Sequence, residues 1–295
     1  MRFFNRKPFV PVLRLSGTIG SMPPLRSGLT LAATAGALEK AFTASKVPGV
    51  VVVINSPGGS PVQSHLIFQR IRALAAEHKK RVHVFCEDVA ASGGYFLAVA
   101  GDEIYADPSS IVGSIGVISS GFGFEKAIEK LGIERRVHTA GLSKSTLDPF
   151  LPEKPEDIER LKTLQKDVHD VFIGVVKDRR AGKLKGLDAE LFSGAYWSAA
   201  RALDHGLIDG IGDVRSRMRA LYGEKIQLRV VPLARGGLLS RLTRGAGTSE
   251  FSGLAAGLAD GLSPASLIGG NLGSNLAADT LAVLEDRALW ARFGL

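Results

Sequence analysis

The chain has 295 residues, of which 45% are hydrophobic and 22% are charged. A chain of this size and composition can bury a substantial core, which excludes a disordered protein and leaves room for one large domain or two small ones. Its 37 Lys and Arg residues outnumber its 29 Asp and Glu residues, so the formal net charge is +8. The basic residues are mixed with acidic ones and are never interleaved with aromatic residues, which argues against a nucleic-acid partner.

The only cysteine, Cys86, excludes an intramolecular disulfide and favours the cytoplasm. Pro8, Pro11 and Arg14 interrupt the apolar start of the chain, so we expect neither a signal peptide nor a membrane anchor there. Any membrane contact is therefore expected to be peripheral and to use the basic surface. Cys86 itself, at the end of an apolar run, is expected to be a core residue.

The first half of the chain alternates predicted strands and helices. Thr30 is placed to cap one helix, and Pro61 stands where the first turn of the next helix accepts proline. Between them, the β-branched run GVVVVIN is typical of a parallel strand that is covered on both faces. The predicted elements are strand 9–15, helix 30–46, strand 49–55, helix 61–78, strand 81–86, helix 92–101 and strands 103–106 and 115–118. This alternation predicts an α/β fold.

The second half is dominated by one long amphipathic helix. The predicted elements are helix 122–131, strand 134–140, loop 141–155, helix 156–181, short helices around 197–206 and 213–221, and strand 225–231. From Arg235 onward the sequence becomes rich in Gly, Ala, Ser and Leu. We therefore predict a domain over residues 1–232 and an appendage over 233–295 that is flexible or loosely helical, with a final helix near 276–291.

Two adjacent glycines, Gly58 and Gly59, follow the strand 49–55 in the segment NSPGGSPV. Such a turn can point unpaired N–H groups at a phosphate or at a developing oxyanion. The segment has neither Walker spacing nor a lysine after the second glycine, and GFGFEK at 121–126 lacks the last glycine of a dinucleotide fingerprint. Nucleotide binding is therefore disfavoured, and no cofactor is expected.

Ser92 lies between a predicted strand and an apolar helix and is followed by Gly93. It can be a helix N-cap or a nucleophile whose oxyanion is held partly by the Gly93 N–H, and the residues alone leave both readings open. None of the six histidines stands beside an aspartate in a loop or has metal-ligand spacing. Lys144 lies in a loop of small and polar residues, where an ordinary solvated lysine is the usual finding.

Six stretches, taken in order, resemble the signal peptide peptidase A family of serine proteases and, more distantly, the proteolytic subunit of Clp protease. They are INSPGG (54–59), ASGGYFLA (91–98), GSIGVI (113–118), EKLGI (129–133), GLSKSTLDPF (141–150) and FSGAYWSAARALDHGLID (192–209). The resemblance extends over about residues 10–232. It implies a Clp protease/crotonase-like fold of repeated β-β-α units with a long helical arm, and a catalytic core over about 48–182.

The resemblance also implies a Ser/Lys dyad. Its motif positions make Ser92 the nucleophile, Lys144 the general base, and Ser114 a hydroxyl that hydrogen-bonds the lysine. Residues 110–125 contain no histidine, which disfavours the Ser-His-Asp variant of the Clp subunit. Because only a neutral amine accepts a proton, such a site has to hold its lysine out of water.

The resemblance implies an oxyanion hole made by the N–H of Gly58 or Gly59 and that of Gly93. The expected substrates are signal-peptide remnants or unfolded peptides, cut by a homo-oligomeric ring with its sites at subunit interfaces. One alternative is a crotonase-like acyl-CoA enzyme, which would need acidic residues near the glycine turn, and NSPGGSPVQS has none. Another is a non-catalytic scaffold of the same fold.

Overall fold

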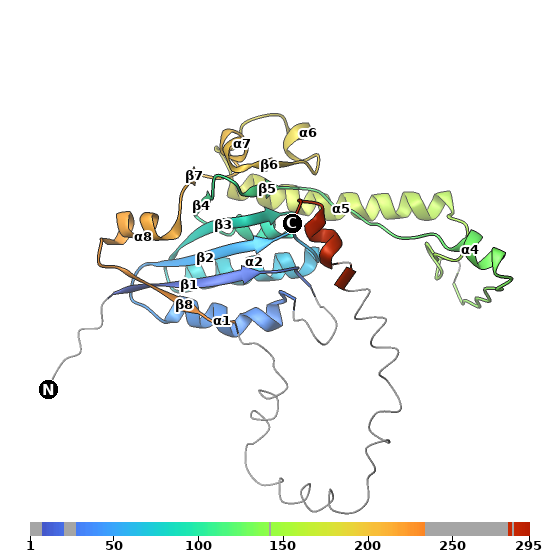
Figure 1. Cartoon of the computed structure of the whole chain (residues 1–295), viewed down its shortest axis with the longest axis horizontal. Helices are drawn as coiled ribbons and strands as arrows, with labels where there is room; N and C mark the ends of the chain where they lie inside the picture. Colours follow the sequence, from blue (N-terminus) through green and yellow to red (C-terminus); the bar gives the residue numbers. More distant parts are fainter. Residues whose placement is uncertain (1–7, 21–27, 142, 234–282, 285) are drawn as a thin grey trace, which may run out of the picture.

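The computed structural model describes residues 8–20, 28–141, 143–233, 283–284 and 286–295 (Figure 1). Its strands are β1 (Phe9–Ser16), β2 (Gly49–Ser56), β3 (Arg81–Ala91), β4 (Glu103–Ala106), β5 (Ile111–Gly113), β6 (Tyr196–Ser198), β7 (Gly210–Ile211) and β8 (Gln227–Val231). Its helices are α1 (Leu31–Thr43), α2 (Pro61–Glu77), α3 (Gly93–Ala98), α4 (Glu125–Lys130), α5 (Pro155–Arg179), α6 (Asp188–Leu191), α7 (Ala199–Asp204) and α8 (Val214–Tyr222).

The strands form one sheet in the order β6-β5-β3-β2-β1-β8, and β4 and β7 extend it beside β3. All pairs are parallel except β5 with β6. The first part of β3, His83–Cys86, pairs with β4, and its last part, Val89–Ala91, pairs with β5. This mostly parallel sheet with covering helices confirms the predicted α/β class.

Both faces of the sheet are covered, as the apolar run in β2 predicted. Val50, Val52 and Ile54 pack in the main core with α1, α2 and α3, while Val51 and Val53 face the other way, toward Met218 of α8. All five side chains are buried. The result is a three-layer body in which β2 and β3 are central.

The helix starts follow the local sequence. The Thr30 hydroxyl accepts a hydrogen bond from the Ala33 N–H at 3.1 Å, as predicted for a cap. Pro61 occupies the first turn of α2, where its missing N–H would have no partner in any case. The end of α1 was predicted too late, because the helix stops at Thr43 rather than at residue 46.

Three strand predictions are wrong. Strand β3 continues past residue 86 to Ala91, since Val89–Ala91 pair with β5, while the Glu87 and Asp88 carboxylates contact Arg14 and Asn55 at 2.6 Å each. Residues 115–118 form no strand, and the strand near them is β5. Residues 134–140, predicted as a strand, lie exposed and form none, and no strand among the described residues lies beside them.

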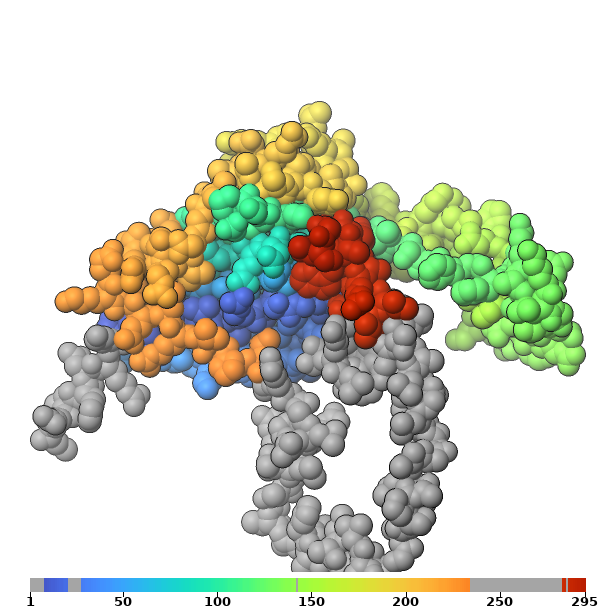
Figure 2. All heavy atoms as spheres, viewed as in Figure 1, coloured from blue at the N-terminus to red at the C-terminus, as the bar shows by residue number. Residues whose placement is uncertain are grey.

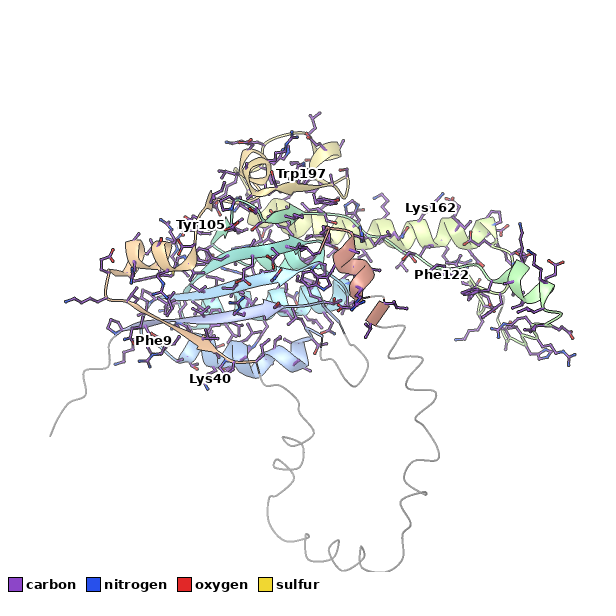
Figure 3. All side chains as sticks on the ribbon, in the orientation of Figure 1. Phe9, Lys40, Tyr105, Phe122, Lys162 and Trp197 are labelled. Atoms are coloured by element: carbon purple, nitrogen blue, oxygen red, sulfur yellow. The ribbon has the colours of Figure 1, made fainter. Side chains whose placement is uncertain are left out.

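A long arm projects from the body (Figures 1 and 2). It consists of residues 117–141 and 143–154, including α4, and of the adjoining first turns of α5, and Phe122 and Lys162 lie on it (Figure 3). None of the residues of α4 is buried. This arm agrees with the predicted long helical arm.

Most of the predicted appendage, residues 234–282 and 285, lies outside the described residues. The predicted final helix is confirmed where it is described, since residues 283–284 and 286–291 are helical. Of the helices among the described residues, none combines the length and the apolar composition needed to span a bilayer.

Candidate active site

Ser92 occupies a tight turn between β3 and α3. Its backbone has φ 52° and ψ −123°, a conformation that residues with a Cβ rarely adopt. The Ser92 N–H donates to the Gly113 carbonyl at 2.8 Å, and the Ser92 carbonyl accepts from the Phe96 N–H at 3.0 Å. The hydroxyl makes no capping hydrogen bond, which contradicts the N-cap reading of this side chain. A strained serine on a strand-to-helix turn is typical of an exposed nucleophile.

The two glycines of the 58–59 turn allow the close approach of two backbone segments. A Cβ on Gly58 would come within 2.8 Å of the Ser92 Cβ and 2.9 Å of the Gly93 nitrogen. A Cβ on Gly59 would lie 2.0 Å from the Ile19 carbonyl oxygen. Both glycines also have positive φ, 108° and 137°. The turn can therefore lie against Ser92 only without side chains.

The structure distinguishes the backbone donors in this turn. The Gly58 N–H donates to the Ser56 hydroxyl at 3.2 Å. Among the described residues, neither the N–H of Gly59 nor that of Gly93 donates a hydrogen bond. Two N–H groups beside one serine, both without an acceptor, can together hold an oxyanion. The pair available for this is Gly59 and Gly93.

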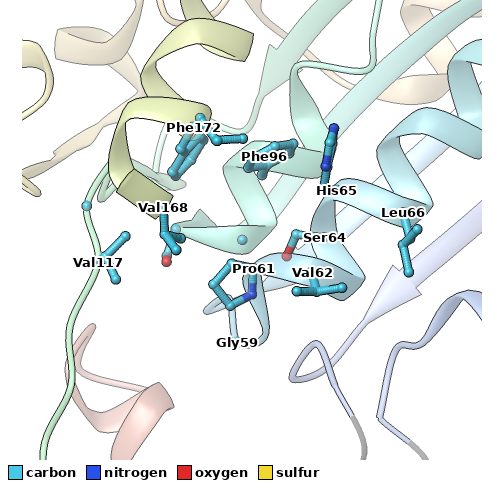
Figure 4. A pocket seen from close by; sticks show the side chains of 14 residues that line it. Gly59, Pro61, Val62, Ser64, His65, Leu66, Phe96, Val117, Val168 and Phe172 are labelled. Carbon is cyan, nitrogen blue, oxygen red and sulfur yellow. The ribbon is translucent and has the colours of Figure 1, made fainter. Parts of the chain in front are cut away.

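A cavity of about 240 Å³ opens beside these groups (Figure 4). Its lining contains Ser92, Gly59 and Gly93, and its walls come from α2, α3, α5 and the segment after β5. The remaining lining residues are Pro61, Val62, Ser64, His65, Leu66, Phe96, Gly116, Val117, Val168, Val171 and Phe172. No carboxylate, lysine or arginine is among them, so the cavity suits an uncharged apolar side chain.

Ser114 lies close to the Ser92 turn. It directly follows Gly113, whose carbonyl holds the Ser92 N–H, and it is buried. Its φ is also 52°, and its N–H donates to the Ala195 carbonyl at 2.7 Å. The Ser114 hydroxyl makes no hydrogen bond within the part of the chain that the structure describes, so it is available to a group brought from elsewhere.

Lys144 lies in the arm, away from the cavity. Its side chain is exposed and forms no ion pair with any described residue. It does not line the cavity beside Ser92. A single chain therefore brings Ser92, Ser114, Gly59 and Gly93 together and leaves Lys144 apart from them.

The loop that carries Lys144 is ordered around Asp148. The Asp148 carboxylate accepts a hydrogen bond from the Phe150 N–H at 3.0 Å and another from Arg135 at 3.0 Å. These bonds, that from Phe150 foremost, lower the pKa of the carboxyl group. The arm thus holds its exposed lysine on a structured loop.

Two features of the site were not found from the sequence. The α5 wall of the cavity, Val168, Val171 and Phe172, shows only an i, i+3, i+4 spacing, which is that of any amphipathic helix. His65 lies in the cavity wall with its ring 5.7 Å from that of Phe96, and no motif marks it.

Cys86 is a core residue, as predicted, and burial raises the pKa of its thiol to about 12.

Comparison with known proteins also indicates a peptidase. Residues 75–225 match the model of peptidase family S49. A Synechocystis protein whose name marks it as an unconfirmed protease is 31% identical over 212 residues, which cover 70% of this chain and 75% of that protein. The chloroplast serine protease SPPA of Arabidopsis thaliana is 31% identical over 200 residues, covering 68% of this chain and 28% of the relative.

Two longer relatives match the whole chain. Proteins of Brucella abortus and Brucella melitensis, both named Na⁺/H⁺ antiporter, are each 54% identical to it over 299 residues. The match covers 100% of this chain but 38% of each relative. The chain thus spans less than two fifths of the length of these relatives.

Proposed function

The chain belongs to peptidase family S49, and from this premise we propose that it is a serine endopeptidase with a Ser92/Lys144 dyad. One observation carries the proposal: a strained serine that caps nothing lies beside two N–H groups without acceptors, at the edge of an apolar cavity. Acyl transfer needs these parts, namely a nucleophile, an oxyanion hole and a place for the substrate side chain.

In the proposed reaction, the neutral amine of Lys144 takes the proton from the Ser92 hydroxyl. The Ser92 oxygen attacks the peptide carbonyl carbon, and the resulting oxyanion accepts hydrogen bonds from the N–H groups of Gly59 and Gly93. The lysine then gives its proton to the leaving amine as the C–N bond breaks. In the second half of the reaction, the Lys144 amine takes a proton from water, and the water oxygen attacks the acyl carbon. The bond to the Ser92 oxygen then breaks, and the lysine returns the proton to that oxygen. Ser114 orients the amine by hydrogen bonding.

The lysine of each site comes from a neighbouring copy of the chain in a homo-oligomeric ring. Lys144 is exposed on a projecting arm, while Ser92 and Ser114 lie on the body. The arm also carries exposed apolar side chains that a second copy would cover. They are Ile118, Phe122, Leu131 and Ile133, which are 64%, 79%, 73% and 55% exposed. Large apolar groups gathered on one surface mark a contact surface.

The proposed substrates are peptides with an uncharged apolar side chain next to the cleaved bond. The cavity beside Ser92 has apolar walls from Val62, Val168 and Phe172 and holds no full charge to pair with an ionised side chain. Remnants of signal peptides and segments of unfolded proteins supply such side chains. An acyl-CoA reaction is less well supported, since no carboxylate lines this cavity to act as its acid or base.

The protein works in the cytoplasm, in peripheral contact with an anionic membrane surface. Support comes from the name of the Brucella relatives, because antiport is transport across a membrane. The α8–β8 region adds support: Arg215, Arg219, Lys225 and Arg229 are exposed there and outnumber the exposed carboxylates of Asp213 and Glu224. Co-sedimentation with anionic but not neutral vesicles, lost in Arg215→Glu/Arg219→Glu, is the expected result. Equal binding to both vesicle types would refute the proposal.

Hydrolysis of a peptide amide with leucine before the cleaved bond tests the catalytic proposal. We expect Ser92→Ala and Lys144→Ala each to lower kcat by at least about a hundredfold. Exposed residues of the same types on the body, in Ser109→Ala and Lys40→Ala, serve as controls and should leave kcat unchanged. Wild-type activity should rise toward mildly alkaline pH, because the base must be neutral. Full turnover by Lys144→Ala would remove this lysine from the mechanism.

Mixing the two inactive variants tests the shared site. In a ring of Ser92→Ala and Lys144→Ala subunits, some interfaces join an intact Ser92 to an intact Lys144, so activity should return. Mixed rings that form but stay inactive would show that both residues must come from one chain.

A further inference from the structure

The last residues of the chain lie against the body (Figures 1 and 2), where they contact Val89 and Ala91 of β3, the strand that leads to the Ser92 turn. Residues 286–291 are helical, and residues 292–295 complete the segment with turns. The sequence gives no motif for this placement. The C-terminal segment is held on the body by three separate contacts, and each of them is with a strand or loop that leads directly into the candidate active site.

The first contact lies behind the serine turn itself. The side chains of Val89 and Ala91 at the end of β3 are fully buried, and they form a small cluster with Phe293, which is 7% exposed. Ile111 of β5 and Trp290 pack at its edge. This is the face of β3 opposite to that of Ala90 and α3 in the main core. Phe293 thus packs against the residue that immediately precedes Ser92.

The second contact holds the strand that anchors Ser92. The Tyr196 ring packs edge-on against Phe293 with 5.1 Å between ring centroids, and its hydroxyl donates to the Arg292 carbonyl at 3.3 Å. Tyr196 in β6 pairs with Gly113 in β5, and the Gly113 carbonyl accepts the Ser92 N–H. The C-terminal segment therefore supports the hydrogen bond that holds the serine turn.

The third contact lies on the side of the glycine turn. The Thr18 hydroxyl donates a hydrogen bond to the Asp286 carboxylate. The next residue, Ile19, donates its N–H to the Gly58 carbonyl and accepts from the Ser60 N–H, both at 2.8 Å. The C-terminal segment therefore spans both halves of the candidate oxyanion hole, since one half contains Gly59 and the other contains Gly93.

We propose that residues 286–295 form a C-terminal clamp that holds the Ser92 turn in its reactive geometry, with Phe293 as the positioning residue. The inference rests on the proposed function and adds to it a group that never touches the substrate. A strained turn persists only when the surrounding structure fixes it. Among the described residues, the clamp is what covers Val89 and Ala91 on this face of β3. Without it, these side chains would meet water and the turn could relax.

The test compares full-length Phe293→Ala with Leu284→Ala, a control in the same terminal region whose side chain is 57% exposed. Because a small misplacement of a nucleophile is enough to slow the reaction, we expect Phe293→Ala to lower kcat about tenfold while KM stays within about twofold. Phe293→Leu should restore most of kcat, and Leu284→Ala should match the wild type. An unchanged kcat in Phe293→Ala would overturn the proposal.

Hydrogen exchange gives a readout that does not need activity. In Phe293→Ala, the backbone amides of residues 89–92 should exchange faster while those of β1 and β2 keep their protection. An equal loss of protection over the whole sheet would show general destabilisation and would refute the clamp. If the wild type proves to have no peptidase activity, the proposed function fails. The hydrogen exchange of Phe293→Ala, compared with that of the wild type, then tests by itself whether the clamp holds the Ser92 turn.

A second variant covers the case in which Phe293→Ala does not fold. Tyr196→Phe removes only the hydroxyl that bonds the Arg292 carbonyl. It should lower kcat about two- to threefold at constant KM and speed the exchange of residues 286–293. Wild-type values for both measurements in Tyr196→Phe would then count against the clamp.

Discussion

Ser92 is the residue at which stability and reactivity conflict. Its φ of 52° and ψ of −123° lie outside the regions that residues with a Cβ favour, and such strain costs about 1–3 kcal/mol. In return, the hydroxyl makes no capping hydrogen bond with the helix, and Ser92 lines the apolar cavity. The neighbouring Gly58 can approach this turn because it has no side chain.

Ser92→Gly should therefore stabilise the protein relative to Ser92→Ala. Both variants lack the hydroxyl and should be inactive, but only glycine adopts the backbone conformation of residue 92 without strain. Glycine also makes the unfolded chain more flexible, which offsets part of the gain. We expect the free energy of unfolding of Ser92→Gly to exceed that of Ser92→Ala by about 1 kcal/mol, measured by urea denaturation. A less stable glycine variant would mean that the turn carries no strain.

At the scale of elements, the sequence correctly predicts the helices and strands whose conformation is decided by their own residues. The apolar run of β2 and the capped, periodic starts of α1 and α2 agree with the structure because local pattern and core position coincide. The end of β3 was missed, since the local sequence shows neither the pairing of Val89–Ala91 with β5 nor the compensation of the Glu87 and Asp88 side chains by Arg14 and Asn55. That compensation comes from distant parts of the chain.

The candidate site likewise has parts that the sequence predicts and parts that it does not. The turn at Gly58 and Gly59 and the start of α3 at Ser92 could be predicted, because both follow strands and lie at one edge of a parallel sheet. The α5 wall of the cavity could not, since periodicity shows that a helix has an apolar face but not what that face contacts. Residues 134–140 show the opposite error, because a segment predicted as a strand stays exposed and forms none when no described strand lies beside it to pair with.

The arm makes a prediction of its own. Phe122, 79% exposed, contacts Phe124, and Phe124 stacks on Phe150 at 5.6 Å, so the arm carries a small aromatic cluster with one open side. If a second copy covers Phe122, burial of that ring stabilises the assembly by about 1.5–3 kcal/mol per interface. Phe122→Glu should therefore shift the protein toward monomers and lower peptidase activity together, as measured by sedimentation velocity and peptide hydrolysis.

The control for this variant is Lys40→Glu, which places the same side chain on an exposed position of α1 in the body (Figure 3). It should leave the sedimentation profile unchanged. An unchanged profile for Phe122→Glu would show that this part of the arm is not in the interface.

At the scale of the whole molecule, one sheet gathers nearly everything that the proposed reaction needs. Because β3 pairs with β2 on one side and with β5 on the other, the turns that follow these three strands meet around Ser92. Lys144 is the exception, since it lies on the arm. The division at residue 232 stays a prediction, although the segment 286–295 packs on the body rather than apart from it.

Two ionisable groups of the body, His83, which is buried, and Asp209, which is partly buried, contribute to how the stability of the chain depends on pH. His83 is 1% exposed, with Nδ1 3.3 Å from Glu103 and Nε2 2.9 Å from the Tyr222 hydroxyl. Burial lowers the pKa of His83 and outweighs the opposing attraction of Glu103. The folded protein thus takes up this proton at a lower pH than the unfolded chain, whose histidines titrate near about 6.5.

Asp209 affects the free energy of unfolding at a lower pH than His83 does. Burial alone would raise its pKa, but hydrogen bonds from Arg180 and Lys183, 2.7 Å each, outweigh burial and lower it. An unfolded aspartate takes up its proton near about pH 3.9, whereas the folded one does so at lower pH. The stability that this group contributes is therefore present above that value and is lost as the pH falls below it.

The free energy of unfolding should therefore fall in two steps on acidification, the first beginning near about pH 6.5 and the second near about pH 4. In both steps the unfolded chain binds protons that the folded chain does not, so the equilibrium shifts toward unfolding. His83→Gln keeps hydrogen-bonding atoms at this position but cannot titrate, so it should flatten the first step and leave the second. Urea denaturation at pH 7.5, 5.5 and 3.5 measures both, and an equally steep first step in His83→Gln would assign it to other groups.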